Sequence, residues 1–391
     1  MVHNTPTAGR TTAARPGANK PVAITGIAFS GADAGNYTLV GGSRTVDVTQ
    51  ASLTVTTSNV VKTYDGTLSV SGATTAAAPV VLTGSGTQLF GSDSLSGGDY
   101  AYTDTHAGTS NKTVTVGNVT VNDGFSGGNY AVTYANNTTS TINRAALTVT
   151  ALTQTKVYDG NTTVVSSALG TGYSVSGLIT GETLDSVTLA YATKDVSRDG
   201  NGVVQSNKTI TVGGAVATSG TQLTDYAITY VNDTASTITP YVVSLTGTRV
   251  YDATTDVAAS KLVIGTLVGS ETLSLSGSGT LADKNVGQNK SVGLGTLTLV
   301  DGTAGGLAGN YALTGSRTVD VTRAVISTVS GITATNKTYD GNDTATLVTS
   351  GATFNGMFSG DVLNVATSTG VFSDPRAATG KTDRKSTRLN S

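Results

Sequence analysis

The chain has 391 residues, enough for several small domains, and 37% of them are hydrophobic, which argues against disorder along its whole length. Its 23 basic and 25 acidic residues nearly balance, so the composition offers no electrostatic basis for binding nucleic acid or an anionic membrane. The absence of cysteine excludes disulfides, thiolate catalysis and cysteine-ligated metals.

Other signals of a membrane protein or an enzyme are also missing from the sequence. No apolar run approaches the roughly 18 residues needed to span a bilayer, so no membrane insertion is expected. The N-terminal segment lacks a signal-peptide pattern. His3 is terminal and His106 stands alone, so no histidine pair can serve a metal or acid–base chemistry. We expect no catalysis, no cofactor and no metal.

A short string containing tyrosine and aspartate recurs along the chain. It reads "KTYDG" at Lys62, "KVYDG" at Lys156, "RVYDA" at Arg249 and "KTYDG" at Lys337, with a period of about ninety residues. A feature renewed at such a period more often builds a structural module than an active site. The candidate motif residues are Lys62, Tyr64, Asp65 and Gly66; Lys156, Tyr158, Asp159 and Gly160; Tyr251 and Asp252; and Lys337, Tyr339, Asp340 and Gly341.

The segments between the motifs predict strands. Apolar and polar residues alternate in runs such as "KTVTV", "YAVTY" and "STITP", which is the period of a half-buried strand. Turns rich in Gly, Asn, Asp and Ser separate these runs. The pattern predicts an all-β protein made of small antiparallel, immunoglobulin-like β-sandwich modules in an extended tandem array. The alternative is a parallel β-solenoid, whose coils of about 20 to 30 residues fit the period less well.

Two further landmarks recur in each repeat. An acidic residue stands two positions before a leucine, and a "GNY" string or its variant "TDY" comes near the end of the repeat. The acidic residues are Asp93, Glu182, Glu271 and Asp361, and the tyrosines are Tyr37, Tyr130, Tyr226 and Tyr311. A lysine also opens an alternating run at Lys112, Lys208 and Lys290, which we interpret as an edge strand protected against pairing with another chain.

The recurring motif has a structural explanation. In an extended strand Lys62 and Tyr64 lie on one face, so the lysine stem can cover the ring while its ammonium stays in water. Asp65 and Gly66 then reverse the strand, because aspartate bonds to the backbone and glycine accepts positive φ. Alanine at position 253 indicates that this turn does not strictly demand positive φ. The tyrosine adds buried area, and its hydroxyl must find a partner.

The landmarks predict the boundaries of the repeats. The predicted segments are 1–50, the C-terminal part of a module; 51–144, repeat one; 145–240, repeat two; 241–323, repeat three; 324–382, a truncated repeat four; and 383–391, a non-native tail. The tail is basic in a chain that is otherwise poor in charge, and it resembles translated adaptor sequence.

The combined pattern resembles a known family. KxYDG strings in register with "ADKNVGQNK" (282–290) and "AGNYALTG" (308–315) resemble the YDG repeats, which are akin to MBG-type modules of large bacterial surface proteins of the filamentous haemagglutinin or autotransporter adhesin type. The resemblance implies an extracellular location on the bacterial cell surface, a stalk or adhesive role, and no enzymatic activity.

Three functions are compatible with the sequence. The first is a stalk or spacer in which each module's partners are the neighbouring modules of the same chain. The second is binding of host-surface glycans or matrix proteins, with the tyrosines of the GNY strings stacking on sugar rings. The third is covalent cross-linking between lysine and asparagine beside a buried acid, with Lys112, Lys208 and Lys290 as candidates.

Overall fold

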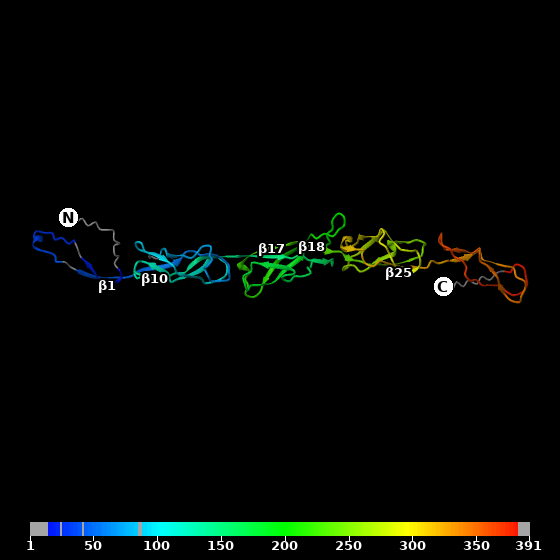
Figure 1. Ribbon diagram of the computed structural model, residues 1–391, viewed down its shortest axis with the longest axis horizontal. Coiled ribbons are helices and arrows are strands. Elements are labelled where there is room, and N and C mark those ends of the chain that lie inside the picture. The colour runs from blue at the N-terminus through cyan, green and yellow to red at the C-terminus, as the bar shows by residue number, and fades with distance from the viewer. Residues whose placement is uncertain (1–14, 24–25, 41–42, 85–87, 382–391) are drawn as a thin grey trace. The chain divides into compact units, whose positions relative to one another are not determined.

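The computed structural model describes residues 15–23, 26–40, 43–84 and 88–381 (Figure 1). These residues divide between two compact units, the first within Met1–Leu152, Ser166–Leu189 and Thr211–Asn232, and the second within Thr153–Val165, Ala190–Ile210 and Asp233–Ser391. The predicted tail at 383–391 and the isolated His3 lie outside the described residues.

Among its described residues, the first unit contains fourteen whole strands and two short 3-10 helices. They are β1 (Gly17–Ala23), β2 (Ser43–Val48), β3 (Ala51–Thr57), β4 (Val61–Thr63), β5 (Pro79–Val81), β6 (Ser94–Ser96), β7 (Asp99–Tyr102), β8 (Gly108–Gly117), β9 (Thr120–Asn122), β10 (Tyr130–Tyr134), β11 (Asn137–Asn143), β12 (Ala145–Ala151), β14 (Tyr173–Ser176), β17 (Tyr226–Val231), η1 (Ala34–Asn36) and η2 (Leu223–Asp225). Strands β15 (Leu184–Tyr191) and β16 (Lys208–Ala217) are divided between the two units.

The second unit contains the remaining elements. They are β13 (Thr155–Val157), β18 (Asp233–Thr239), β19 (Tyr241–Val242), β20 (Leu245–Val250), β21 (Asp256–Ala258), β22 (Leu262–Ile264), β23 (Leu273–Ser276), β24 (Ser278–Thr280), β25 (Gly287–Ser291), β26 (Thr298–Asp301), β27 (Tyr311–Ala312), β28 (Thr318–Thr322), β29 (Thr328–Ser330), β30 (Thr333–Ala334), β31 (Thr344–Ala345), β32 (Leu347–Val348), β33 (Thr353–Asn355), β34 (Gly370–Val371), η3 (Ala259–Lys261) and η4 (Ala308–Asn310).

The predicted all-β fold is confirmed, since the described residues form strands, short 3-10 helices and turns. Repeat one contains the sheets β10-β3-β5, β4-β11-β8-β7 and β6-β9. The same arrangement returns in repeat two as β14-β12-β17 and β13-β18-β16-β15. Sheets of two to four strands are thus renewed in each repeat, as a tandem array of small modules requires.

Strand pairing within a repeat is mixed rather than wholly antiparallel. The opening strand β3 runs parallel to β10, with Ala51 opposite Tyr130, and β4 runs parallel to β11, with Lys62 opposite Ile142. Strand β11 also pairs with β8 in the antiparallel direction. One segment, residues 51–63, therefore contributes a strand to two different sheets of its repeat and ties them together.

Repeats one and three each have their own aliphatic core. Leu53 and Val55 of β3 pack against Val116, Val119 and Val121 in repeat one. An equivalent cluster in repeat three is built on Leu245, Leu262, Val319 and Val321, among others. The alternation of strand residues places these side chains on one face of each sheet, which is why the period-two pattern marks them in advance.

The interpretation of the lysine-led strands as edge strands is wrong in two of three cases. Strand β8 lies between β11 and β7, and β16 lies between β18 and β15, whereas β25 does lie at the end of its sheet. Lys112 is buried and its ammonium binds the carboxylate of Asp104. The long stem lets the charge reach this partner, so lysine is tolerated on an interior strand.

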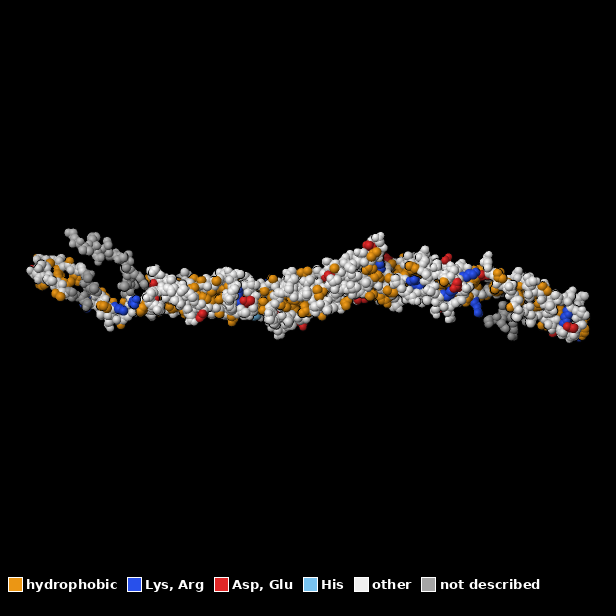
Figure 2. Space-filling view, viewed as in Figure 1, with side chains coloured by type: hydrophobic (Ala, Val, Ile, Leu, Met, Phe, Trp, Pro, Cys, Tyr) orange, Lys and Arg blue, Asp and Glu red, His pale blue; other side chains and the backbone are white. Residues whose placement is uncertain are grey.

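Charge is sparse on the face drawn in Figure 2. There the acidic and basic side chains lie in small separate groups among uncharged ones, in agreement with the balanced composition. No helix in the part of the chain that the structure describes has the length and apolar character needed to cross a membrane.

Candidate functional site: tyrosine–carboxylate junctions

The KxYDG string encloses its own lysine. Lys62 is only 1% exposed, and its Nζ donates to Asp65 Oδ1 at 2.7 Å and to the carbonyls of Thr67 and Ser69 at 2.6 and 3.0 Å. The ammonium also lies 5.3 Å from the centre of the Tyr102 ring. The prediction that this ammonium stays in water is therefore wrong: the loop after the aspartate folds back and replaces its water ligands.

The other repeats build the same enclosure. Lys156 is buried and donates to Asp159 Oδ1 at 2.7 Å and to two loop carbonyls. In repeat three, Arg249 takes the lysine position and binds Asp252 Oδ1 at 2.5 Å, and its buried Nε has no hydrogen-bond partner among the residues that the structure describes. In repeat four, Lys337 binds Asp340 at 2.7 Å but is more exposed.

The aspartate of the motif is held in its ionised form. Partial burial opposes ionisation of Asp159, but the hydrogen bonds donated by Lys156 and by the backbone of Asn161 outweigh it and lower the pKa of the carboxyl. The same balance lowers the pKa of Asp65 beside Lys62. The motifs of repeats one to three are thus ion pairs with one buried partner.

The turn after the aspartate has positive φ in all four copies. The φ angles are 75° at Gly66, 79° at Gly160, 67° at Ala253 and 83° at Gly341. The interpretation that alanine at 253 shows positive φ to be unnecessary is therefore wrong. Ala253 adopts the left-handed conformation and bears its steric cost.

Replacing Ala253 by glycine is expected to stabilise repeat three by about 1 kcal/mol, because glycine removes the clash of a Cβ at positive φ. The reverse change, Gly160→Ala, should destabilise repeat two, since its Cβ would lie 3.0 Å from Val268 Cγ1 as well as at positive φ. Native-state hydrogen exchange of each repeat measures both. Equal effects of the two substitutions would contradict this explanation.

The tyrosine hydroxyl of the motif finds its partner in the following repeat. Tyr64 donates to Glu182 Oε1 at 2.5 Å, and Tyr226 of the "TDY" string donates to the other carboxylate oxygen of Glu182. The two rings meet edge to face, with centroids 5.5 Å apart. One carboxylate of repeat two therefore accepts from a tyrosine of its own repeat and one of the preceding repeat. We call this arrangement junction one.

Junction two repeats the arrangement between repeats two and three. Tyr158 donates to Glu271 Oε1 at 2.5 Å, and Tyr311 donates to Oε2 at 2.6 Å. The side chain of Glu271 is 8% exposed, and Lys194 adds an ion pair at 3.4 Å. The rings of Tyr158 and Tyr311 again meet edge to face, at 5.6 Å.

Junction three, between repeats three and four, is a variant. Tyr251 donates to Asp361, with 2.8 Å to each carboxylate oxygen, and Lys284 pairs with the same carboxylate at 2.7 Å. Phe358 packs edge to face on Tyr251 in place of a second tyrosine. At the last motif, Tyr339 is 66% exposed.

The electrostatics favour charged carboxylates at junctions two and three and neutral tyrosines at junctions one and two. Burial of Glu271 opposes its ionisation, but hydrogen bonds from Tyr158, Tyr311 and Lys194 outweigh this and lower its pKa. Burial and the Glu182 carboxylate raise the pKa of Tyr226 to about 12, and they also raise that of Tyr64. The contacts are therefore charge-assisted hydrogen bonds, which are stronger than neutral ones.

The structure thus joins three landmarks that the sequence shows separately: the motif tyrosine, the acidic residue before the leucine, and the tyrosine of the GNY string. The four tyrosines that were candidates for stacking on sugar rings differ in exposure: Tyr130, Tyr226 and Tyr311 are buried, whereas Tyr37 is exposed. No group of three or more potential metal-binding His, Asp or Glu side chains occurs among the described residues.

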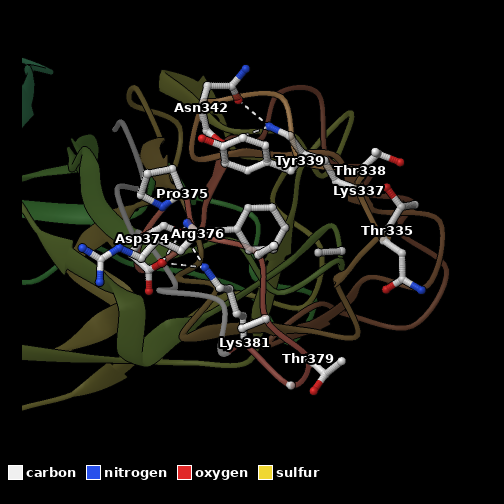
Figure 3. A pocket seen from close by; sticks show the side chains of 16 residues that line it. Thr335, Lys337, Thr338, Tyr339, Asn342, Asp374, Pro375, Arg376, Thr379 and Lys381 are labelled. Carbon is white, nitrogen blue, oxygen red and sulfur yellow. Dashed lines mark hydrogen bonds and ion pairs between the residues drawn. The ribbon is translucent and has the colours of Figure 1, made fainter.

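A hollow of about 510 Å³ lies beside the motif of repeat four. Figure 3 shows Lys337 bound to Asn342 on one side of it and Lys381 bound to Asp374 on the other. In repeat one, strands β4 and β8 both pair with β11, through Ile142 among other residues.

Three segments of the chain match a known protein family. The model of the YDG domain matches residues 49–139, 234–319 and 323–387, which together make up more than half of the chain. No curated protein matches the sequence. Repeat two lies largely outside the matched segments, yet Lys156, Tyr158 and Asp159 make the contacts of Lys62, Tyr64 and Asp65. With its motif, its period and its match in agreement, the chain belongs to the YDG domain family.

Proposed function

We propose that this chain is a stalk or spacer segment of a secreted bacterial surface adhesin, without catalysis, in which each repeat's partners are its neighbours in the chain. The observation that supports this proposal most directly is the sharing of one carboxylate between tyrosines of consecutive repeats. A spacer must resist bending, and a buried charge-assisted contact restrains the angle between modules where a flexible linker would not. A contact that recurs between consecutive repeats suits a spacer better than it suits a catalytic site.

The strands and turns support the same role. A module built of strands at about 3.3 Å per residue is about 30 Å long, so four modules in line would reach on the order of 100 Å. The sparse charge and the separate cores suit a chain whose repeats need only bind one another. A location outside the bacterial cell follows for the proposed adhesin.

Small-angle X-ray scattering tests the proposal. The full chain should scatter as an extended particle, with a maximum dimension on the order of 100 Å or more. A triple variant, Glu182→Ala, Glu271→Ala and Asp361→Ala, should have a smaller mean radius of gyration and a broader distance distribution, because its repeats can bend at the junctions. Each single variant should give part of this change. A compact wild-type particle, or identical curves for wild type and triple variant, would count against a spacer.

A further inference from the structure

A second contact accompanies the carboxylate at junction one. Asp225, of the string "TDY", is 1% exposed. Its Oδ1 accepts the backbone N–H of Ala107 at 2.7 Å, and its Oδ2 lies 2.7 Å from His106 Nδ1. His106 and Ala107 belong to the loop between β7 and β8 of the preceding repeat. A backbone donor and a side-chain donor thus both face a buried carboxylate.

Junction two contains the same contact with its side-chain polarity reversed. Asn310, of the string "GNY", is 1% exposed, and its Oδ1 accepts the backbone N–H of Val196 at 2.8 Å. Its Nδ2 donates to Asp195 Oδ1 at 2.8 Å. The backbone bond is unchanged, but here the following repeat donates and the loop of the preceding repeat accepts.

The two pairs are not interchangeable. Repeat two has Asp195 in its loop and Asp225 before its tyrosine. If a loop of the first kind met a following repeat of the second kind, two carboxylates would be in contact with no donor between them. Like charges in a desolvated contact are strongly unfavourable. Histidine is more tolerant, because its Nδ1 can donate to a carboxylate or, in the other tautomer, accept from an amide.

We propose that the loop residue at 106 or 195 and the residue at 225 or 310 form a matching pair that determines which repeat can follow which. A repeat with aspartate in its loop accepts a following repeat of the GNY type and rejects one of the TDY type, whereas a repeat with histidine accepts the TDY type. This inference rests on the proposed coupling of consecutive repeats and adds a rule for their order.

Repeat one supplies an independent observation. Asn129 stands before Tyr130 as Asn310 stands before Tyr311, and its Oδ1 is buried without a hydrogen-bond partner among the described residues. An unsatisfied buried acceptor is costly. The acceptor that the Val196 N–H satisfies at Asn310 is thus left open at Asn129.

The test is a charge exchange in the full chain, followed by hydrogen exchange of the peptide that contains the Ala107 amide. His106→Asp should raise the exchange rate by about tenfold, because a second carboxylate then faces Asp225. Adding Asp225→Asn should restore the wild-type rate to within about twofold, since the double variant recreates the Asp195–Asn310 pair. The exposed Thr109→Asp controls for added charge nearby and should leave the rate unchanged.

The reciprocal exchange at junction two guards against an effect peculiar to one site. Asn310→Asp should accelerate exchange of the Val196 amide, and adding Asp195→His should restore it. If His106→Asp has no effect, or if neither second substitution restores protection, the matching rule is overturned. Glu182→Ala separates the two proposals. If Glu182→Ala raises the hydrogen-exchange rate at junction one and the substitutions at His106 and Asp225 do not, the repeats are coupled but the matching rule is wrong. If neither kind of substitution raises the rate, both proposals are wrong.

Discussion

Replacing Glu271 by alanine is expected to open junction two at a cost of about 3 kcal/mol. The substitution removes the acceptor of two buried tyrosine hydroxyls, those of Tyr158 and Tyr311, and the counter-charge of Lys194. Hydrogen bonds to charged groups contribute about 1.5 to 3 kcal/mol each, and their sum is reduced because the hydroxyls can be rehydrated once the contact opens. The backbone N–H of Val268 donates to the Tyr311 hydroxyl, so its hydrogen exchange measures the opening.

The pH dependence of the opening of junction two tests whether the ionised Glu271 carboxylate is responsible. The folded state lowers the pKa of Glu271 below its ordinary value of 4.5, so its contribution is present above that value and is lost as the pH falls through the folded pKa. The free energy of opening junction two should therefore differ most between wild type and Glu271→Ala at neutral pH, and this difference should decrease as the pH is lowered. Asp256→Ala, at an exposed acidic residue of the same repeat, should change little at any pH. A difference that persists unchanged in acid would contradict the assigned role of the carboxylate.

The strands and the repeat could be predicted because both signals are local. Leu53 and Val55 alternate with polar neighbours, which places them on one face of a strand whatever its partners are. The parallel pairing of β3 with β10 could not be predicted in the same way. A strand's own pattern records which face is buried, not which strand lies beside it or in which direction that strand runs.

The sequence identifies the residues of the site but does not show that they contact one another. A buried tyrosine hydroxyl needs a partner, and that requirement follows from the sequence. Its acceptor, Glu182, lies 118 residues after Tyr64 in another repeat. The available signal was that the motif tyrosine, the acidic residue and the GNY tyrosine recur with one period, as three groups that meet once per junction must do.

The errors at the motif have a common cause. Lys62 was predicted to keep its ammonium in water, but the carbonyls of Thr67 and Ser69 take the place of water. Every residue has a carbonyl, so this enclosure leaves no mark in the residue types. The strain at Ala253 is hidden too, because alanine seldom adopts positive φ and its presence gives no sign of that conformation.

Replacing Asp159 by alanine is expected to destabilise repeat two by about 3 kcal/mol, because it leaves the buried ammonium of Lys156 without a counter-charge. The carbonyls of Asn161 and Thr163 still accept from Lys156, but dipoles compensate a buried charge less well than an ion does. The amide of Tyr158 donates to the carbonyl of Thr239 at 2.8 Å, and its hydrogen exchange gives the free energy of opening.

A double-mutant cycle distinguishes an uncompensated charge from simple loss of contacts. Lys156→Met combined with Asp159→Ala should cost less than Asp159→Ala alone, because the double variant buries no charge and methionine keeps most of the stem's packing. Asp185→Ala, at an exposed aspartate of the same repeat, should have little effect. Additive costs in the double variant would show that the two groups act independently, and the ion pair would then not be what holds the loop after Tyr158 in place.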